Sequence, residues 1–221
     1  MNDIYNIIIC GVGGQGIVLS SRILGEAGVK LGFSVRIGET FGAAQRGGSV
    51  VSHVRIGIKE KVYSPTILKG KCDLLLGFEP VETLRYIDYL SPQGTIIVNT
   101  SPVYPISVLA KREKYPSIDE IINTLKTVAE NVLYFDATAI ANAIREESKM
   151  KVTPINMVIL GAATAIDTFP IPASVLKESI SEAVPQKYIE PNLKAFEEGR
   201  EKALKILKLG EVQHLVVFKN S

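Results

Sequence analysis

The sequence predicts an α/β protein with a doubly wound, mainly parallel sheet, an inserted β-hairpin and a helical C-terminal portion. In the first 147 residues, short apolar runs of strand length alternate with segments of helical period, the pattern of a parallel sheet covered by helices. A glycine-rich turn joins the first strand to the first helix, as in Rossmann-like domains. From residue 154 onward the period is predominantly helical, and proline stands at or near the start of each segment.

The first strand, at 5–10, and the first helix, at about 15–31, meet at this glycine-rich turn. The turn contains Gly11, Gly13, Gly14, Gln15 and Gly16. Its G-x-G-x-x-G spacing lets the backbone approach a phosphate while the helix N-terminus presents free N–H groups to the anion. The same glycines also allow a helix to pack closely on a sheet without any ligand. The spacing alone leaves both interpretations open.

A short second strand, at 34–37, leads into a long glycine-rich segment at 38–48. The polar and glycine residues of interest there are Glu39, Gln45, Arg46, Gly47 and Gly48. Glu39 follows the glycine turn at about the distance of an acidic residue that binds an adenosine ribose. Arg46 could bind a carboxylate or phosphate through its guanidinium, or could hold an interface. A loop this long costs conformational entropy, so we expect it to have a function.

The next segment, 49–56, alternates between two sets of residues with strand period. A turn at 57–60 and a returning strand at 61–64 would complete a β-hairpin. A hairpin is unusual within a series of parallel strands. We expect it to brace the preceding loop, for example against another subunit.

Regular alternation then resumes, and no internal repeat or linker interrupts the chain, so we expect one domain over 1–221. Ser117 is a candidate helix N-cap, and the acidic residues Glu79 and Glu82 suit the start of a helix. Strands are predicted at 73–77, 95–99 and 132–135, and helices at 81–89, 117–128, 138–147, 154–166, 172–183 and 190–207, followed by a last short strand at 214–218.

The composition is that of a globular protein and excludes several classes of function. Hydrophobic residues make up 46% of the 221 residues, charged residues 22%, and the net charge is +2, which argues against disorder, nucleic-acid binding and membrane-surface binding. No signal segment or membrane-spanning run occurs, so we expect a cytoplasmic protein. The two cysteines, Cys10 and Cys72, lie at apolar strand positions without a C-x-x-C motif. They cannot build an iron–sulfur cluster or a zinc site, and no metal site is expected.

No independent active site is evident in the sequence. It contains neither a Gly-x-Ser-x-Gly nucleophile elbow nor a phosphate loop ending in Gly-Lys-Ser/Thr. His53 lies inside an alternating strand beside Arg55, where a structural role is expected. A stand-alone NAD(P)-binding oxidoreductase remains an alternative, based on the glycine turn and Glu39, but no acid or base for hydride transfer accompanies them.

Two segments together resemble a known family. They are GVGGQG at 11–16 and ETFGAAQRGGSVVSHVR at 39–55, and both look like gamma-type subunits of 2-oxoacid:ferredoxin oxidoreductases. Within that family the likeness is greatest to the beta subunits that act on indolepyruvate. The Gln-Arg-Gly-Gly-Ser-Val run at 45–50 is more specific than the glycine turn. The resemblance is strongest in the first third of the chain and extends over most of it.

The resemblance implies an accessory subunit of a heteromeric oxidoreductase. The complex would oxidatively decarboxylate an arylpyruvate with coenzyme A, giving aryl-acetyl-CoA, CO2 and reduced ferredoxin. Thiamine diphosphate and the iron–sulfur clusters would belong to a large catalytic alpha subunit, and ferredoxin would accept the electrons. A related 2-oxoacid with another side chain is an alternative substrate. The cofactor-binding candidates on this chain are Gly11, Gly13, Gly14, Gln15, Gly16, Glu39, Gln45, Arg46, Gly47 and Gly48, while catalytic residues cannot be assigned.

Overall fold

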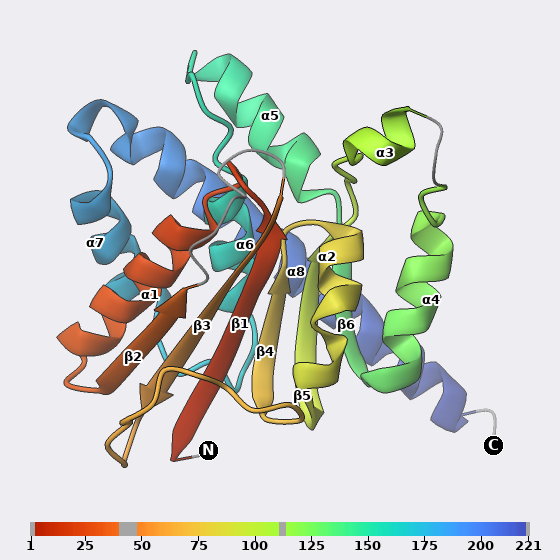
Figure 1. Ribbon diagram of the computed structural model, residues 1–221, viewed down its shortest axis with the longest axis horizontal. Helices are drawn as coiled ribbons and strands as arrows, with labels where there is room; N and C mark the ends of the chain where they lie inside the picture. The colour runs from red at the N-terminus through yellow and green to blue at the C-terminus, as the bar shows by residue number, and fades with distance from the viewer. Residues whose placement is uncertain (1–2, 40–47, 111–113, 220–221) are drawn as a thin grey trace.

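The computed structural model describes residues 3–39, 48–110 and 114–219, which form a six-stranded sheet in the order β2-β3-β1-β4-β5-β6 with helices on both faces (Figure 1). The strands are β1 (Ile4–Val12), β2 (Ser34–Glu39), β3 (Ser49–Gly57), β4 (Cys72–Gly77), β5 (Leu90–Asn99) and β6 (Asn131–Phe135). The helices are α1 (Ile17–Lys30), α2 (Pro80–Arg85), α3 (Ile106–Leu109), α4 (Ile118–Val128), α5 (Ala137–Glu147), α6 (Ile155–Ala163), α7 (Ala173–Ala183) and α8 (Ile189–Lys219). Short 3-10 turns cover Ile87–Tyr89 and Gln186–Tyr188.

The central strand β1 separates two hydrophobic cores. Ile7 and Ile9 point into the core shared with α1, α6, α7 and α8. Ile8 and Cys10 point into the core on the other face, which α4 helps to cover. In Figure 1, α2 lies on the near face and α8 passes behind the sheet. Burial on both faces explains the unbroken apolar run 7–10 within β1. The predicted α/β class and the helical C-terminal portion are confirmed.

The strand β3 gives the sheet its antiparallel part. It pairs antiparallel with both β1 and β2, whereas the pairs β1–β4, β4–β5 and β5–β6 are parallel. The predicted hairpin with a returning strand at 61–64 is wrong, because that segment has no strand structure. The physical reason is that β1 and β2 already occupy both edges of β3. A returning strand would have no free hydrogen-bonding edge to join.

The segment that follows β3 instead crosses one face of the sheet as an extended strap, 59–71. Hydrogen bonds along its length fix it. The Val62 N–H donates to Ser34 Oγ at 3.0 Å, Arg55 Nη1 donates to the Ser64 carbonyl at 2.9 Å, and the Ile67 N–H donates to His53 Nδ1 at 3.2 Å. Ile67 is itself buried in the core on this face. The strap therefore covers part of this face of the sheet.

The histidine under the strap makes stability dependent on pH. The pKa of His53 lies below its ordinary value of 6.5, because partial burial disfavours the charged ring. In the window below about pH 6.5 the unfolded chain therefore binds more protons than the folded chain. Stability is expected to fall as the pH is lowered through that window, when protonation of Nδ1 also breaks the Ile67 hydrogen bond. Above pH 6.5 this contribution is constant.

Urea unfolding at pH 7.5 and pH 5.5 checks this expectation, with His53→Gln as the comparison. Carboxylates contribute to the pH dependence of both proteins, but only the parent chain carries the contribution of His53. The parent chain should lose more stability than His53→Gln between the two pH values. Equal losses would show that the histidine does not control the strap.

The C-terminal end of the chain is helical. The predicted strand at 214–218 is wrong, because α8 continues to Lys219. A short apolar run fits a strand or a helix equally well by period. Extending a helix that is already formed requires no new nucleation, so the helix is the outcome where no sheet edge receives the run.

Candidate functional site

The sequence-predicted residues gather at one edge of the sheet. β1 and β2 run in the same direction, since both are antiparallel to β3, and β4, β5 and β6 are parallel to β1. The carboxyl ends of these five strands therefore lie at the same edge of the sheet, the carboxyl edge, where ligands bind in open α/β sheets. The glycine turn, Glu39 and Gly48 all lie there. The predicted Gln45, Arg46 and Gly47 lie outside the described residues.

The glycine turn is required by conformation and by packing. Gly14 and Gly16 have φ of 102° and 85°, a region that side chains disfavour. Gly16 is also the N-cap of α1. A Cβ atom at Gly16 would lie 2.9 Å from Cγ of Asn156, a buried residue at the start of α6. The turn thus brings the first residues of α1 and α6 together at the carboxyl edge.

Several polar groups of the turn are already paired within the protein. The Gly13 N–H donates to the Gly48 carbonyl at 3.0 Å, and the Gln15 N–H donates to the Val12 carbonyl at 3.2 Å. The Val12 N–H donates to Gln15 Oε1 at 2.7 Å. A pyrophosphate at this turn would have to displace the Gly48 carbonyl from Gly13. The Gly13–Gly48 bond also joins the two motifs that are far apart in sequence.

A buried amide network continues from the turn along the carboxyl edge. The Phe78 carbonyl accepts hydrogen bonds from both Gln15 Nε2 and Asn99 Nδ2, each at 3.0 Å. Asn99 is fully buried, and its Oδ1 accepts from the N–H groups of Ala137 at 2.9 Å and Thr138 at 3.3 Å. This network connects the glycine turn with the start of α5. The side chain of Gln15 therefore braces the site.

The carboxylate of Glu39 faces α1. Its Oε1 accepts a hydrogen bond from Ser21 Oγ at 2.8 Å, and Ser21 is fully buried. One oxygen of the predicted ribose-binding acid is therefore already engaged. Its role in binding a ligand stays a prediction.

A second carboxylate at this edge, Glu79, was expected only as a favourable charge near a helix start. The side chain is buried and caps α2 by accepting from the Glu82 N–H at 2.8 Å. It also accepts from the Val103 N–H at 3.3 Å and from the Tyr115 hydroxyl. Burial, together with the Glu79 carboxylate, raises the pKa of Tyr115. The acid directly before Pro80 is the sequence signal for this cap. Its hydrogen bonds with Val103 and Tyr115 are tertiary contacts.

The two cysteines are buried and unpaired, as predicted. Burial raises the pKa of Cys10 well above its ordinary value and that of Cys72 to about 12, so neither thiol is ionised at neutral pH. Among the described residues no three His, Cys, Asp or Glu side chains are grouped as metal ligands. In the same part of the chain, no helix has the length and apolar character to cross a bilayer.

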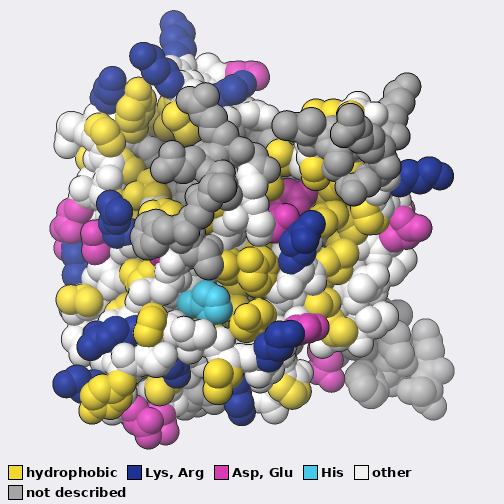
Figure 2. Space-filling view, in the orientation of Figure 1, with side chains coloured by type: hydrophobic (Ala, Val, Ile, Leu, Met, Phe, Trp, Pro, Cys, Tyr) yellow, Lys and Arg dark blue, Asp and Glu magenta, His cyan; other side chains and the backbone are white. Residues whose placement is uncertain are grey.

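The face of the molecule seen in Figure 2 carries charges of both signs. Figure 2 shows positive and negative side chains interspersed over the near face, with apolar groups between them. Among the described side chains of that face, Lys and Arg form no extended stripe of the kind used for nucleic acid.

The fold and its carboxyl edge define a doubly wound α/β protein whose Gly-rich turn is held largely by its own chain. The family described as pyruvate ferredoxin/flavodoxin oxidoreductase matches residues 6–202. The chain belongs to this family.

Two relatives and one solved structure show which members of the family the chain is similar to. The chain is 41% identical to the indolepyruvate oxidoreductase subunit IorB of Pyrococcus horikoshii, over 93% of this chain and 98% of the relative. It is 32% identical to the 2-oxoglutarate synthase subunit KorC of Methanothermobacter marburgensis, over 88% and 94%. The crystal structure of a keto/oxoacid ferredoxin oxidoreductase gamma subunit from Geobacter sulfurreducens is similar, with a TM-score of 0.63, 26% identity, and coverage of 91% and 99%.

Proposed function

We propose that the chain is the accessory beta subunit of an indolepyruvate:ferredoxin oxidoreductase. The complex would convert an arylpyruvate and coenzyme A to aryl-acetyl-CoA, CO2 and two electrons, which reduce ferredoxin. The observation that carries the proposal is the 41% identity to an indolepyruvate oxidoreductase subunit along nearly the whole of both chains. The identity to a 2-oxoglutarate synthase subunit is lower, at 32%.

The cofactors of the reaction are proposed to lie on a large catalytic alpha subunit. Thiamine diphosphate there would stabilise the carbanion formed on decarboxylation, and iron–sulfur clusters would carry the electrons. This chain has only two cysteines, and they sit in the interior of the sheet with raised pKa values. A [2Fe–2S] or [4Fe–4S] cluster is held by four cysteine thiolates, so the ligands would come from the partner. We place the complex in the cytoplasm and treat residues 1–221 as one domain.

The carboxyl edge is the part of this chain proposed to face the partner's active site. It brings the glycine turn, Glu39 and Gly48 together, with Gln45, Arg46 and Gly47 in the connection between them. Glycine-rich backbone and an arginine are suited to the phosphates of coenzyme A. The competing proposal, a stand-alone NAD(P) enzyme, is disfavoured because the relative with 41% identity is an oxidoreductase subunit and because the carboxylate of Glu39, the expected ribose ligand, is already engaged by Ser21.

The test is to prepare the chain alone and together with the large subunit encoded by the same organism. The heteromer should reduce ferredoxin when given indolepyruvate and coenzyme A, and should be brown from its iron–sulfur clusters. The chain alone should be colourless and inactive. Pyruvate and 2-oxoglutarate serve as matched substrates and should be turned over more slowly than indolepyruvate.

Two outcomes would contradict the proposal. Faster turnover of 2-oxoglutarate or pyruvate by the heteromer would assign the chain to a related oxidoreductase. Saturable binding of NADH by the isolated chain, with activity in the absence of the large subunit, would support the stand-alone alternative.

A further inference from the structure

The N-termini of α1 and α6 meet at the carboxyl edge. Gly16 is the N-cap of α1, and Asn156 is the second residue of α6. A Cβ atom at Gly16 would lie 2.9 Å from Cγ and 3.0 Å from Nδ2 of Asn156, so the two helix starts are in van der Waals contact. The N-terminus of a helix carries a partial positive charge. Two such ends therefore lie side by side at this point.

Neither helix end is compensated by side chains of its own helix. Both α1 and α6 lack an acidic residue in the first turn, and neither N-cap residue makes a side-chain cap hydrogen bond. The carboxylate of Glu39 contacts α1 further along, at Ser21 in the second turn. Two adjacent positive ends repel each other, and an anion lying between them would relieve that repulsion.

Backbone donors at both helix starts are unpaired. The first hydrogen bond of α1 runs from the Ser20 N–H to the Gly16 carbonyl at 2.9 Å. The N–H groups of 17–19 therefore have no intrahelical acceptor, and no other described residue accepts from them. At α6 the N–H groups of Ile155 and Asn156 likewise have no acceptor in the part of the chain that the structure describes.

The side chain of Asn156 adds an unpaired amide to these donors. Asn156 is only 6% exposed, yet its amide has no hydrogen-bond partner among the described residues. The other two buried asparagines that the structure describes are engaged, since Asn99 donates to the Phe78 carbonyl and Asn192 to the Tyr188 carbonyl. A buried amide without a partner costs free energy. Its position against Gly16 points to a ligand at the start of α1 that completes its hydrogen bonds.

An anion between α1 and α6 also avoids the obstacle at Gly13. The Gly13 N–H is taken by the Gly48 carbonyl at 3.0 Å, whereas the N–H groups of Gly14 and Gly16 have no acceptor among the described residues. A Cβ atom at Gly14 would meet no described atom within 4 Å, so there is open space beside the turn. A ligand at this place displaces no hydrogen bond that the structure describes.

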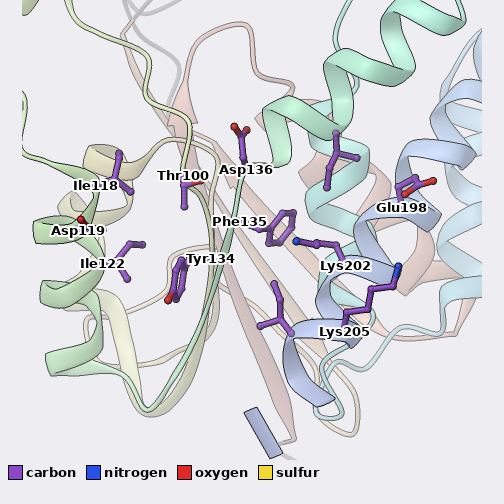
Figure 3. Close-up of a pocket in the computed structure, with 12 residues that line it drawn as sticks. Thr100, Ile118, Asp119, Ile122, Tyr134, Phe135, Asp136, Glu198, Lys202 and Lys205 are labelled. Atoms are coloured by element: carbon purple, nitrogen blue, oxygen red, sulfur yellow. The ribbon is translucent and has the colours of Figure 1, made fainter. Parts of the chain in front are cut away.

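The pocket beside β6 shows the contrasting case. It has a volume of about 720 Å³ and lies between α4 on one side and α5 and α8 on the other (Figure 3). Here the chain compensates the helix ends itself, because Asp119 lies in the first turn of α4 and Asp136 caps α5. Lys202, Lys205 and Glu198 also line the pocket. Charges of both signs are present, so this pocket does not select an anion.

We propose that Asn156 binds a phosphate group together with the unpaired N–H groups at the starts of α1 and α6. The Asn156 amide donates through Nδ2, the backbone N–H groups donate to other oxygens of the phosphate, and both helix dipoles favour its negative charge. A phosphate has several acceptor oxygens, which suits donors that converge from two helices and one side chain. The phosphate is one of those of coenzyme A, an identification that rests on the proposed function. A free phosphate has the same chemistry.

The first test uses the full chain alone and inorganic pyrophosphate. Binding should raise the urea midpoint of the parent chain. Asn156→Asp places a carboxylate between the two helix ends, so without ligand the variant should be at least as stable as the parent. It should gain nothing from pyrophosphate, because like charges repel. Asn192→Asp, the same change at a buried asparagine outside the site, should keep the response to pyrophosphate.

Two results of this test would overturn the proposal. One is a parent chain whose urea midpoint does not respond to pyrophosphate. The other is an Asn156→Asp variant that is destabilised but keeps the full response, as expected of an asparagine that is only structural.

The second test identifies the source of the phosphate. In the heteromer, KM for coenzyme A is compared with KM for pantetheine, which carries the same thiol arm without phosphates. Asn156→Asp should raise KM for coenzyme A about tenfold more than KM for pantetheine, as expected when a hydrogen bond to a charged group is lost. Asn192→Asp should leave the ratio of the two KM values unchanged. An equal rise for both thiols in Asn156→Asp would overturn the assignment to coenzyme A.

Failure of this proposal is distinguishable from failure of the proposed function. If the heteromer oxidises indolepyruvate while Asn156→Asp responds to pyrophosphate and coenzyme A as the parent does, only the phosphate site is wrong. If the parent chain binds pyrophosphate and Asn156→Asp does not, but no complex with the large subunit forms, the phosphate site stands and the proposed function fails.

Discussion

Replacing Gly199 by alanine is expected to lower the free energy of unfolding by about 3 kcal/mol, at the upper end of the usual cost of overpacking. Gly199 lies where α8 crosses α6. A Cβ atom there would lie 2.0 Å from the carbonyl oxygen of Val158, and one at Gly161 would lie 1.8 Å from the carbonyl oxygen of Phe196. The obstructing atoms are backbone, so the two helices must separate to admit a methyl group.

Gly25→Ala in α1 is the matched control for this substitution. The Cβ atom of an alanine there would meet the terminal Cδ1 of Ile37 at 2.6 Å, and that flexible group can move aside. The gain in helix propensity, about 1 kcal/mol, offsets the adjustment. Urea unfolding of the full chain should show Gly25→Ala within about 1 kcal/mol of the parent. Similar stability of Gly199→Ala and Gly25→Ala would contradict the close helix crossing.

The second large effect is expected at the buried amide of the carboxyl edge. Asn99→Ala should lower the free energy of unfolding by about 3 kcal/mol, because it removes the partner of several buried groups at once. The Ala137 N–H loses its acceptor at 2.9 Å, and Thr138 Oγ1 loses the amide at 3.0 Å. The Phe78 carbonyl loses one of its two donors.

Asn192→Ala provides the comparison for this effect. Asn192 is also buried, and its side-chain amide donates to the Tyr188 carbonyl at 2.7 Å within one helical turn. Loss of that local hydrogen bond should cost only about 1 kcal/mol. Both variants are measured by urea unfolding at pH 7.5. If Asn99→Ala destabilises the chain no more than Asn192→Ala does, the stabilising role assigned to the buried amide of Asn99 is wrong.

The activity of the heteromer provides a second measurement for Asn99. The network from Asn99 through the Phe78 carbonyl to Gln15 holds the glycine turn. Asn99→Ala should therefore impair turnover at temperatures at which the variant is still folded. Asn192→Ala, which lies outside this network, should not.

Much of the fold could be predicted because local patterns agree with it. The apolar run of β1, the glycine turn and the capping residue Ser117, which accepts from the Glu120 N–H at 3.2 Å, are each encoded within a few residues. Local patterns failed at 61–64 and 214–218. At 61–64 an antiparallel partner of β3 was expected after it in the chain, whereas β2 and β1, which both precede β3, supply its two partners. At 214–218 a short apolar run carried no information on period.

The candidate site likewise has residues that a local sequence pattern predicts and residues that it does not. The glycine turn could be predicted from the spacing of its glycines. In the structure Gly14 and Gly16 have positive φ, a conformation that glycine adopts readily. Asn99 has no local signal, because the groups it binds lie in Phe78, Ala137 and Thr138. Asn99 can stabilise the fold through these hydrogen bonds only when β4, β5 and β6 lie side by side.

By itself the sequence determined the α/β class, the position of the glycine turn and the resemblance to an oxidoreductase subunit, since each depends on residues close together in the chain. The tertiary structure alone decided that Gly13 is paired with Gly48, that Glu39 faces Ser21, and that β6 is left as an open edge. Hydrogen-bond partners and strand order depend on which distant segments meet when the two cores form. That choice is made by burial across the whole chain, so no local pattern records it.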